Sequence, residues 1–196
     1  MKISVTTRGF GRAVIERKGK KIQKLKKDEI YISQVILDKM EIKAESIFRP
    51  HQKNVETIYA LAGKTSIHDR LYTLSTNAIL YDSGSMEVRV DASQMLEHIM
   101  RDDEKIGLLI FIHTHPEGIP EPSKDDLKFF KHVSSEAKKH FPGMVLYGVH
   151  AINNGEIRNR TNPYKTRKNV IKWSSSTHDH EVGFYNNDGK WVNVII

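Results

Sequence analysis

Two histidines and an aspartate stand at the spacing of a metal site. His113 and His115 lie two residues apart at the end of the apolar segment 107–112, GLLIFI. Residues two apart in a strand project from the same face, so both imidazoles can bind one ion. Asp126 lies three residues after Ser123, at the start of a predicted helix. We interpret His113, His115 and Asp126 as ligands of one zinc ion, with water in the fourth position, as in catalytic zinc sites.

The composition restricts the metal chemistry further. The chain contains no cysteine. Thiolate zinc sites and thiol nucleophiles are therefore excluded, and any metal must be bound through imidazole and carboxylate groups. These ligand types accept iron or another divalent ion as well as zinc.

Hydrolysis at such a site needs a base beside the metal. Zinc lowers the pKa of bound water to around 7, but a second group must take the proton and pass it to the leaving amine. Glu56 is our candidate, because it opens an apolar segment that is typical of a buried strand. The alternatives, Glu41 and Glu45, fall on the predicted solvated face of a helix. We expect Ser123 to donate a hydrogen bond to the oxyanion of the intermediate, or to cap the following helix, or both.

Helices and strands must alternate to position these residues. The apolar periodicity and the capping residues predict the following elements between residues 33 and 160. They are a helix from Ser33 to before Pro50, strands at 56–63, 70–82 and 86–90, a helix from Asp91 to about Arg101, a strand at 107–112, a helix from Ser123 to about His140 and a strand at 144–152. This order predicts a mixed α/β domain whose helices cover a central sheet.

The two ends of the chain predict short β-rich extensions. Glycines at intervals in residues 1–30 predict turns between short strands. The segment 187–189, Asn-Asp-Gly, is typical of the turn of a terminal β-hairpin that ends in WVNVII. We therefore divide the chain into a basic extension of residues 1–30, a central domain of residues 31–164 and a C-terminal extension of residues 165–196.

Other histidines and the tryptophans have structural interpretations. The segment His178-Asp179-His180 has metal-like spacing, but it lies in a polar stretch without a nearby third ligand, so we interpret it as a surface loop. We expect His150 in the core or at a sheet edge, and Trp173 and Trp191 as packing residues.

The charge and hydropathy bear on partners and location. The net charge is +7, with a basic cluster at Arg17, Lys18, Lys20, Lys21, Lys24, Lys26 and Lys27. No aromatic residues interleave with it, so we interpret it as a solvated hairpin, with nucleic acid contact as the alternative. No apolar run approaches the roughly 20 residues of a membrane-spanning helix, and the first residues lack the pattern of a secretory signal. We expect a cytoplasmic protein that does not contact a membrane.

The motif residues resemble a known family. His113-Thr-His115, seven intervening residues and Ser123-Lys-Asp-Asp126 look like the JAMM signature of the JAB1/MPN/Mov34 zinc metalloproteases, in their prokaryotic JAB form. The segment 56–63, ETIYALAG, resembles the upstream strand that carries their catalytic glutamate. The resemblance covers about residues 30 to 160.

This resemblance implies a fold, an activity and a partner. The fold is an MPN-type mixed sheet sandwiched by helices, holding one zinc ion. The activity is cleavage of an isopeptide or peptide bond after the C-terminal glycine of ubiquitin or a ubiquitin-like protein. The segment 113–123 also resembles the motif of bacterial RadC-like proteins. The alternative is therefore a RadC-like, nucleic-acid-associated protein whose basic flank docks on phosphate.

Overall fold

A computed structural model describes most of the central and C-terminal parts of the chain. It covers residues 14–17, 20–24, 29–47, 56–64, 73–74, 106–141, 143–156 and 159–196. The strands expected at 70–82 and 86–90 lie outside these residues, apart from Thr73–Leu74, which form strand β5. The helix expected from Asp91 to about Arg101 also lies outside them.

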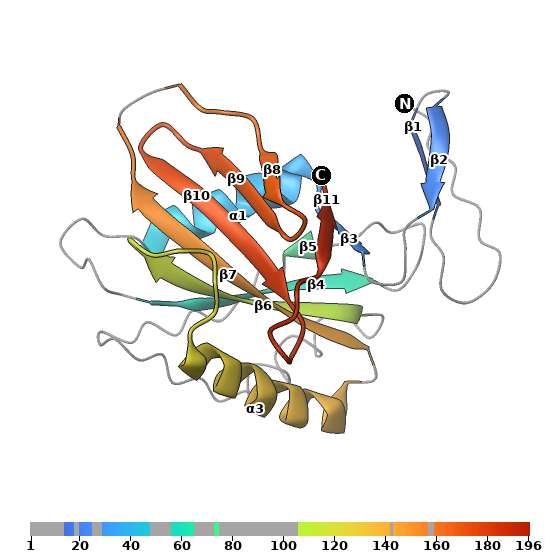
Figure 1. The fold of residues 1–196 in the computed structure, drawn as a ribbon. Coiled ribbons are helices and arrows are strands. Elements are labelled where there is room, and N and C mark those ends of the chain that lie inside the picture. Colours follow the sequence, from blue (N-terminus) through green and yellow to red (C-terminus); the bar gives the residue numbers. More distant parts are fainter. Residues whose placement is uncertain are drawn as a thin grey trace.

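A seven-stranded mixed sheet forms the centre of the described structure (Figure 1). Its order is β5-β4-β6-β7-β10-β9-β8. The strands are β4 (Ile58–Lys64), β5 (Thr73–Leu74), β6 (Ile106–Pro116), β7 (Met144–Asn154), β8 (Tyr164–Arg167), β9 (Val170–Ser174) and β10 (His178–Tyr185). Neighbours in this sheet pair antiparallel, except that β6 and β7 pair in parallel. A parallel pair needs a long crossover, and helix α3 (Lys124–His140) lies in the connection between β6 and β7.

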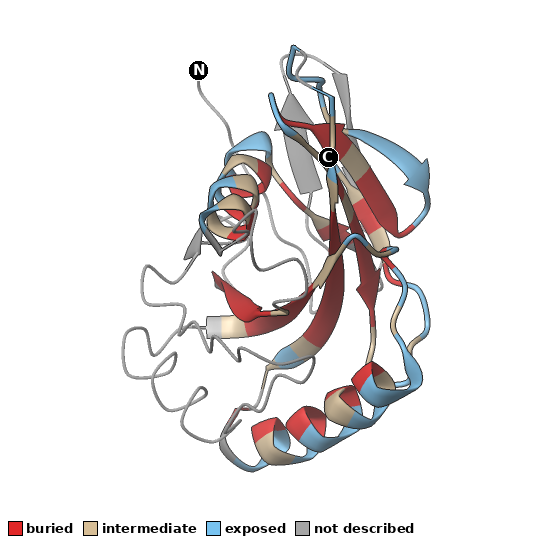
Figure 2. Cartoon of the chain, turned by 90° about the vertical axis from the view of Figure 1, so that its left-hand side faces the viewer, coloured by how far each residue is buried: buried red, intermediate tan, exposed pale blue. Residues whose placement is uncertain are grey.

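Two helices cover opposite faces of the sheet, as Figures 1 and 2 show. Helix α1 (Gln34–Ile47) and helix α3 pack into two separate apolar clusters. Strand β6 contributes Leu108, Ile110 and Ile112 to the α1 cluster, and Leu109 and Phe111 to the α3 cluster. This alternation is the two-residue periodicity of a strand that is buried on both faces. The predicted α/β fold, with a mixed sheet between helices, is confirmed.

Strands from the expected C-terminal extension join the central sheet. β10 pairs with β7 along its whole length, from His178↔Asn154 to Tyr185↔Tyr147. The expected turn at 187–189 forms, with Gly189 at a φ of 74° and a bridge between Tyr185 and Trp191.

The chain beyond this turn does not continue the expected hairpin. β11 (Asn193–Ile195) pairs in parallel with β3 (Glu29–Tyr31). This pairing buries Val192 and Val194 in the α1 cluster beside Ile30, which explains why the chain leaves β10.

The N-terminal strands form a two-stranded sheet of their own. β1 (Val14–Arg17) and β2 (Lys20–Lys24) pair antiparallel. The side chains of the basic cluster lie outside the description, so its contact with nucleic acid stays an untested alternative. Within the described residues, neither helix has the length and apolar character needed to cross a membrane.

Candidate metal centre

Both motif histidines lie on the α3 side of the sheet. β6 extends beyond the expected apolar segment to Pro116 and therefore includes them. The ring centroids of His113 and His115 are 5.0 Å apart, and their side chains are 10% and 14% exposed. The predicted projection from one face is confirmed.

Glu56 reaches the histidines from the neighbouring strand. Ile58 of β4 pairs with His113 of β6, so the start of β4 lies beside the end of β6. Glu56 Oε2 lies 3.1 Å from His113 Nε2. The structure thus brings Glu56 beside the two motif histidines.

Two threonines that the sequence interpretation missed help to hold Glu56 in place. The Thr57 amide donates to Thr114 Oγ1 at 2.8 Å, and the Thr114 amide donates to the Thr57 carbonyl at 2.9 Å. Both residues are buried. Thr114 stands between the two histidines, so strand alternation turns its side chain to the opposite face of the sheet. The position of Thr114 between the two histidines is the sequence feature from which a role in supporting the site could have been predicted.

Asp126 enters the site from the first turn of α3. Ser123 caps this helix in a reciprocal capping box: the Asp126 amide donates to Ser123 Oγ at 3.1 Å, and the Ser123 amide donates to Asp126 Oδ2 at 2.7 Å. The same carboxylate lies 2.5 Å from His113 Nδ1 and 3.2 Å from His115 Nε2. The cap therefore both starts the helix and aims Asp126 at the imidazoles.

The two carboxylates determine the charge of His113. Burial disfavours its protonation, but the hydrogen bonds and charges of Asp126 and Glu56 outweigh burial and raise the pKa of His113 to about 9. Burial also opposes ionisation of Asp126, but hydrogen bonds from His113, His115 and Ser123 hold its pKa well below the usual range. In this arrangement an imidazolium bridges two carboxylates at neutral pH. A metal ion bound at His113 Nδ1 or Nε2 must displace the proton on that nitrogen.

The donor set fits a divalent metal ion. Glu56, His113 and His115 offer ligand atoms that all lie within 4.8 Å of one another. Two imidazoles and a carboxylate are the ligand types that zinc accepts at catalytic sites. Both Glu56 and Asp126 contact His113, so the assignment of Asp126 as ligand and Glu56 as base stays a prediction.

These residues open onto one cleft. It has a volume of about 1040 Å³, and Glu56, both histidines, Ser123 and Asp126 line it. Apolar side chains of Ile58, Ile119 and Phe129 line the same cleft. The structure thus combines a group that can bind a metal with a surface that can receive part of a larger molecule.

The segment from His178 to His180 is not the expected surface loop. It belongs to β10, and His180 is fully buried. The His180 ring stacks on Trp173 at 5.1 Å, and its Nδ1 lies 3.0 Å from Nε2 of the buried His150. His150 and Trp173 are thus confirmed as core residues, whereas Trp191 is 65% exposed.

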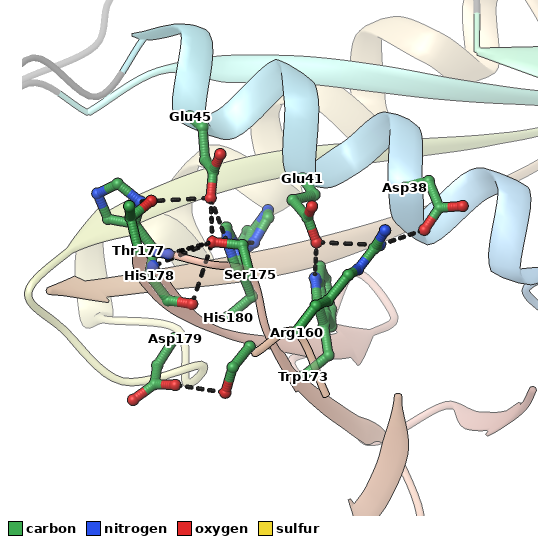
Figure 3. Close-up of polar contacts among 12 residues, drawn as sticks. Asp38, Glu41, Glu45, Arg160, Trp173, Ser175, Thr177, His178, Asp179 and His180 are labelled. Carbon is green, nitrogen blue, oxygen red and sulfur yellow. Dashed lines mark hydrogen bonds and ion pairs between the residues drawn. The ribbon is translucent and has the colours of Figure 1, made fainter. Parts of the chain in front are cut away.

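The expectation that Glu41 and Glu45 face solvent was also wrong. Figure 3 shows both carboxylates turned from α1 towards the strands. Glu41 accepts from Trp173 Nε1 at 2.7 Å, and Glu45 Oε1 lies 3.2 Å from His180 Nε2. β9 and β10 pack beside α1, which the local helical pattern does not reveal. Neither glutamate lines the cleft, so Glu56 is the better candidate for the base.

Comparison with known proteins agrees with this geometry. A search of curated proteins gave no match. The family model that describes prokaryotic homologs of the JAB domain matches residues 44–162, which is more than half of the chain. The matched range includes all five motif residues and ends before β8. The chain therefore belongs to the family of prokaryotic homologs of the JAB domain.

Proposed function

We propose that this protein is a zinc metallopeptidase that hydrolyses isopeptide or peptide bonds at the C-terminal tail of a ubiquitin-like protein. The observation that carries the proposal is the convergence of Glu56, His113 and His115 in the cleft of a JAB domain. The resemblance of the motif to the JAMM signature supports the substrate class.

Each residue has a role that its position supports. His113, His115 and Asp126 would hold zinc, which would polarise the scissile carbonyl and make water more acidic. Glu56 takes the proton of the attacking water and passes it to the leaving nitrogen. His113 faces Glu56 in the structure, so a His113 that has given up its proton on Nε2 leaves the Glu56 carboxylate ready to accept a proton from water.

Ser123 is suited to stabilise the oxyanion. Its Oγ accepts the amide hydrogen of Asp126, and this bond leaves the hydroxyl proton for another acceptor. A hydroxyl aimed at the developing negative charge stabilises the transition state more than the substrate. The apolar side chains of Ile58 and Phe129 line the same cleft and would contact the substrate tail.

The test is cleavage of a panel of ubiquitin-like C-terminal fusions and isopeptide-linked conjugates. Wild type is compared with Glu56→Gln, His113→Ala and the matched control Glu136→Gln, whose carboxylate pairs with Lys139 outside the cleft. We expect Glu56→Gln to bind one zinc ion but to lose at least about 100-fold in rate, the lower end of a general base contribution. His113→Ala should lose both zinc and cleavage, and Glu136→Gln should behave as wild type.

Two results would contradict the proposal. Loss of zinc from Glu56→Gln would make Glu56 a ligand rather than the base. Stoichiometric zinc binding without cleavage of any conjugate, together with binding or hydrolysis of nucleic acid, would refute the peptidase and favour the RadC-like alternative.

A further inference from the structure

The loop 117–122 orients one of the metal-binding histidines. His115 Nδ1 lies 3.1 Å from the carbonyl oxygen of Ile119. A carbonyl oxygen can only accept, so Nδ1 carries a proton. Nε2, which faces Asp126 Oδ2 at 3.2 Å, is then the nitrogen that can bind a metal ion in place of its own proton. The orientation of this ring therefore depends on where the Ile119 carbonyl is held.

The neighbouring residue of this loop is held by β10. The buried hydroxyl of Tyr185 donates to the carbonyl oxygen of Pro120 at 2.5 Å. Gly183, two residues earlier in β10, shows how close the loop lies to the strand: a Cβ there would lie 2.2 Å from the same oxygen. The Pro120 carbonyl is thus seated directly against β10 and is fixed by one side-chain donor.

Other contacts to the loop are weaker or more exposed. Asn153 of β7 donates to the Gly118 carbonyl at 3.2 Å, and Arg167 of β8 pairs with Glu121. Both side chains of the Arg167–Glu121 pair are more than 40% exposed, so solvent screens their attraction. The Tyr185 hydrogen bond is short and buried, which makes it the dominant side-chain contact among these three.

We infer that Tyr185 is a positioning residue of the metal centre, which fixes the Pro120 carbonyl and, through the adjacent Ile119 carbonyl, the imidazole of His115. The inference rests on the proposed metal site. It also assigns part of the site to β10, whereas the family match ends at residue 162. In this chain the metal centre depends on a strand outside the matched range.

Two tyrosines provide a matched test. Tyr147 is fully buried in the same apolar cluster as Tyr185, and its hydroxyl donates to the Phe130 carbonyl at 2.7 Å, on α3 rather than on the loop. Tyr185→Phe and Tyr147→Phe each remove one buried hydroxyl and keep the ring. We expect both variants to lose thermal stability, and Tyr147→Phe to lose at least as much as Tyr185→Phe, because the Tyr147 hydroxyl also accepts from Ser134 Oγ at 2.6 Å.

Only Tyr185→Phe should change the metal site. Competition with a chromophoric chelator measures zinc affinity of the full chain. We expect at least about a 10-fold loss in Tyr185→Phe, the lower end of the range for groups that orient metal ligands, and wild-type affinity in Tyr147→Phe. Equal affinity in the two variants would overturn the inference, even if wild type binds zinc and cleaves its substrate.

The tautomer of His115 provides a readout that needs no metal. Nε2 also faces an acceptor, Asp126 Oδ2 at 3.2 Å, so the comparison is made at Nδ1. Nitrogen-15 NMR of the imidazole should show Nδ1 protonated in wild type and in Tyr147→Phe, and less protonated in Tyr185→Phe. A wild-type protein that binds no zinc would refute the proposed function. The tautomer comparison would still decide whether Tyr185 orients His115, because an unchanged tautomer in Tyr185→Phe overturns the inference.

Discussion

Acidification should destabilise this protein through His180, which lies in a buried chain of hydrogen bonds. Burial opposes ionisation of Glu45, but hydrogen bonds from Ser175 and His180 outweigh it and lower the Glu45 pKa. The Glu45 carboxylate therefore accepts from His180 Nε2 at 3.2 Å. A neutral His180 must then accept at Nδ1 from His150 Nε2 at 3.0 Å, and His150 Nδ1 accepts from the Tyr59 hydroxyl at 2.8 Å.

A second proton on His180 would disrupt this chain of hydrogen bonds, because Nδ1 could no longer accept from His150 Nε2. Burial, with the nearby charges of His178 and Arg160, outweighs the attraction of Glu45 and lowers the pKa of His180 to about 4. In the unfolded chain the imidazole titrates near 6.5. Between these two pKa values His180 is protonated in the unfolded state but not in the folded state. The free energy of unfolding therefore falls as the pH falls.

The size of the effect follows from the two pKa values. The full stability is present above pH 6.5, and His180 removes about 3 kcal/mol of it once the pH has fallen to about 4. Between pH 7 and pH 5 the same relation gives a loss of about 2 kcal/mol. His150 acts in the same direction, because burial lowers its pKa as well.

Urea denaturation of wild type and His180→Gln at pH 7 and pH 5 tests this prediction. Glutamine keeps a donor for Glu45 and an acceptor for His150, but it does not titrate. A chelator removes metal from both proteins, so the contributions of His113 and of the carboxylates largely cancel. From pH 7 to pH 5 the free energy of unfolding of wild type should fall by about 2 kcal/mol more than that of His180→Gln. An equal loss in the two proteins would refute the reasoning.

Four further predictions concern the candidate metal centre and the loop beside it. The raised pKa of His113 stabilises the metal-free protein fully below pH 6.5, so its free energy of unfolding should fall by about 3 kcal/mol as the pH rises through about 9. For the same reason, zinc binding at pH 7 should release a proton, and a binding enthalpy that does not change between buffers of different ionisation enthalpy would contradict this. Ser123→Ala should lower the free energy of unfolding in urea by about 1 kcal/mol, because the helix loses its cap, and it should also lower kcat. Ser123→Thr should retain most of the stability and most of kcat. Gly183→Ala should lower the free energy of unfolding in urea by about 1–3 kcal/mol, because the new Cβ must displace the Pro120 carbonyl. A variant as stable as wild type would show that the loop moves aside without cost.

Local patterns in the sequence were sufficient for the elements around the motif. The apolar run before His113 predicted β6, and Ser123 followed by a helical periodicity predicted α3 with its cap. Both signals operate over a few residues: strand alternation turns His113 and His115 to one side, and a capping serine places Asp126 in the first helical turn. The placement of Glu56 beside His113 was also predicted, and the β4–β6 pairing accounts for it.

Only the tertiary structure decided what surrounds these elements. β10 pairs with β7 and packs beside α1, so it buries His180, turns Glu45 inward and brings Tyr185 to the Pro120 carbonyl. The partners of these contacts are far apart in the chain. A helical pattern distinguishes polar from apolar positions, but it does not show which polar positions a distant strand will cover. The sequence therefore predicted the residues of the candidate site, and the long-range strand pairing determined which residues hold them in place.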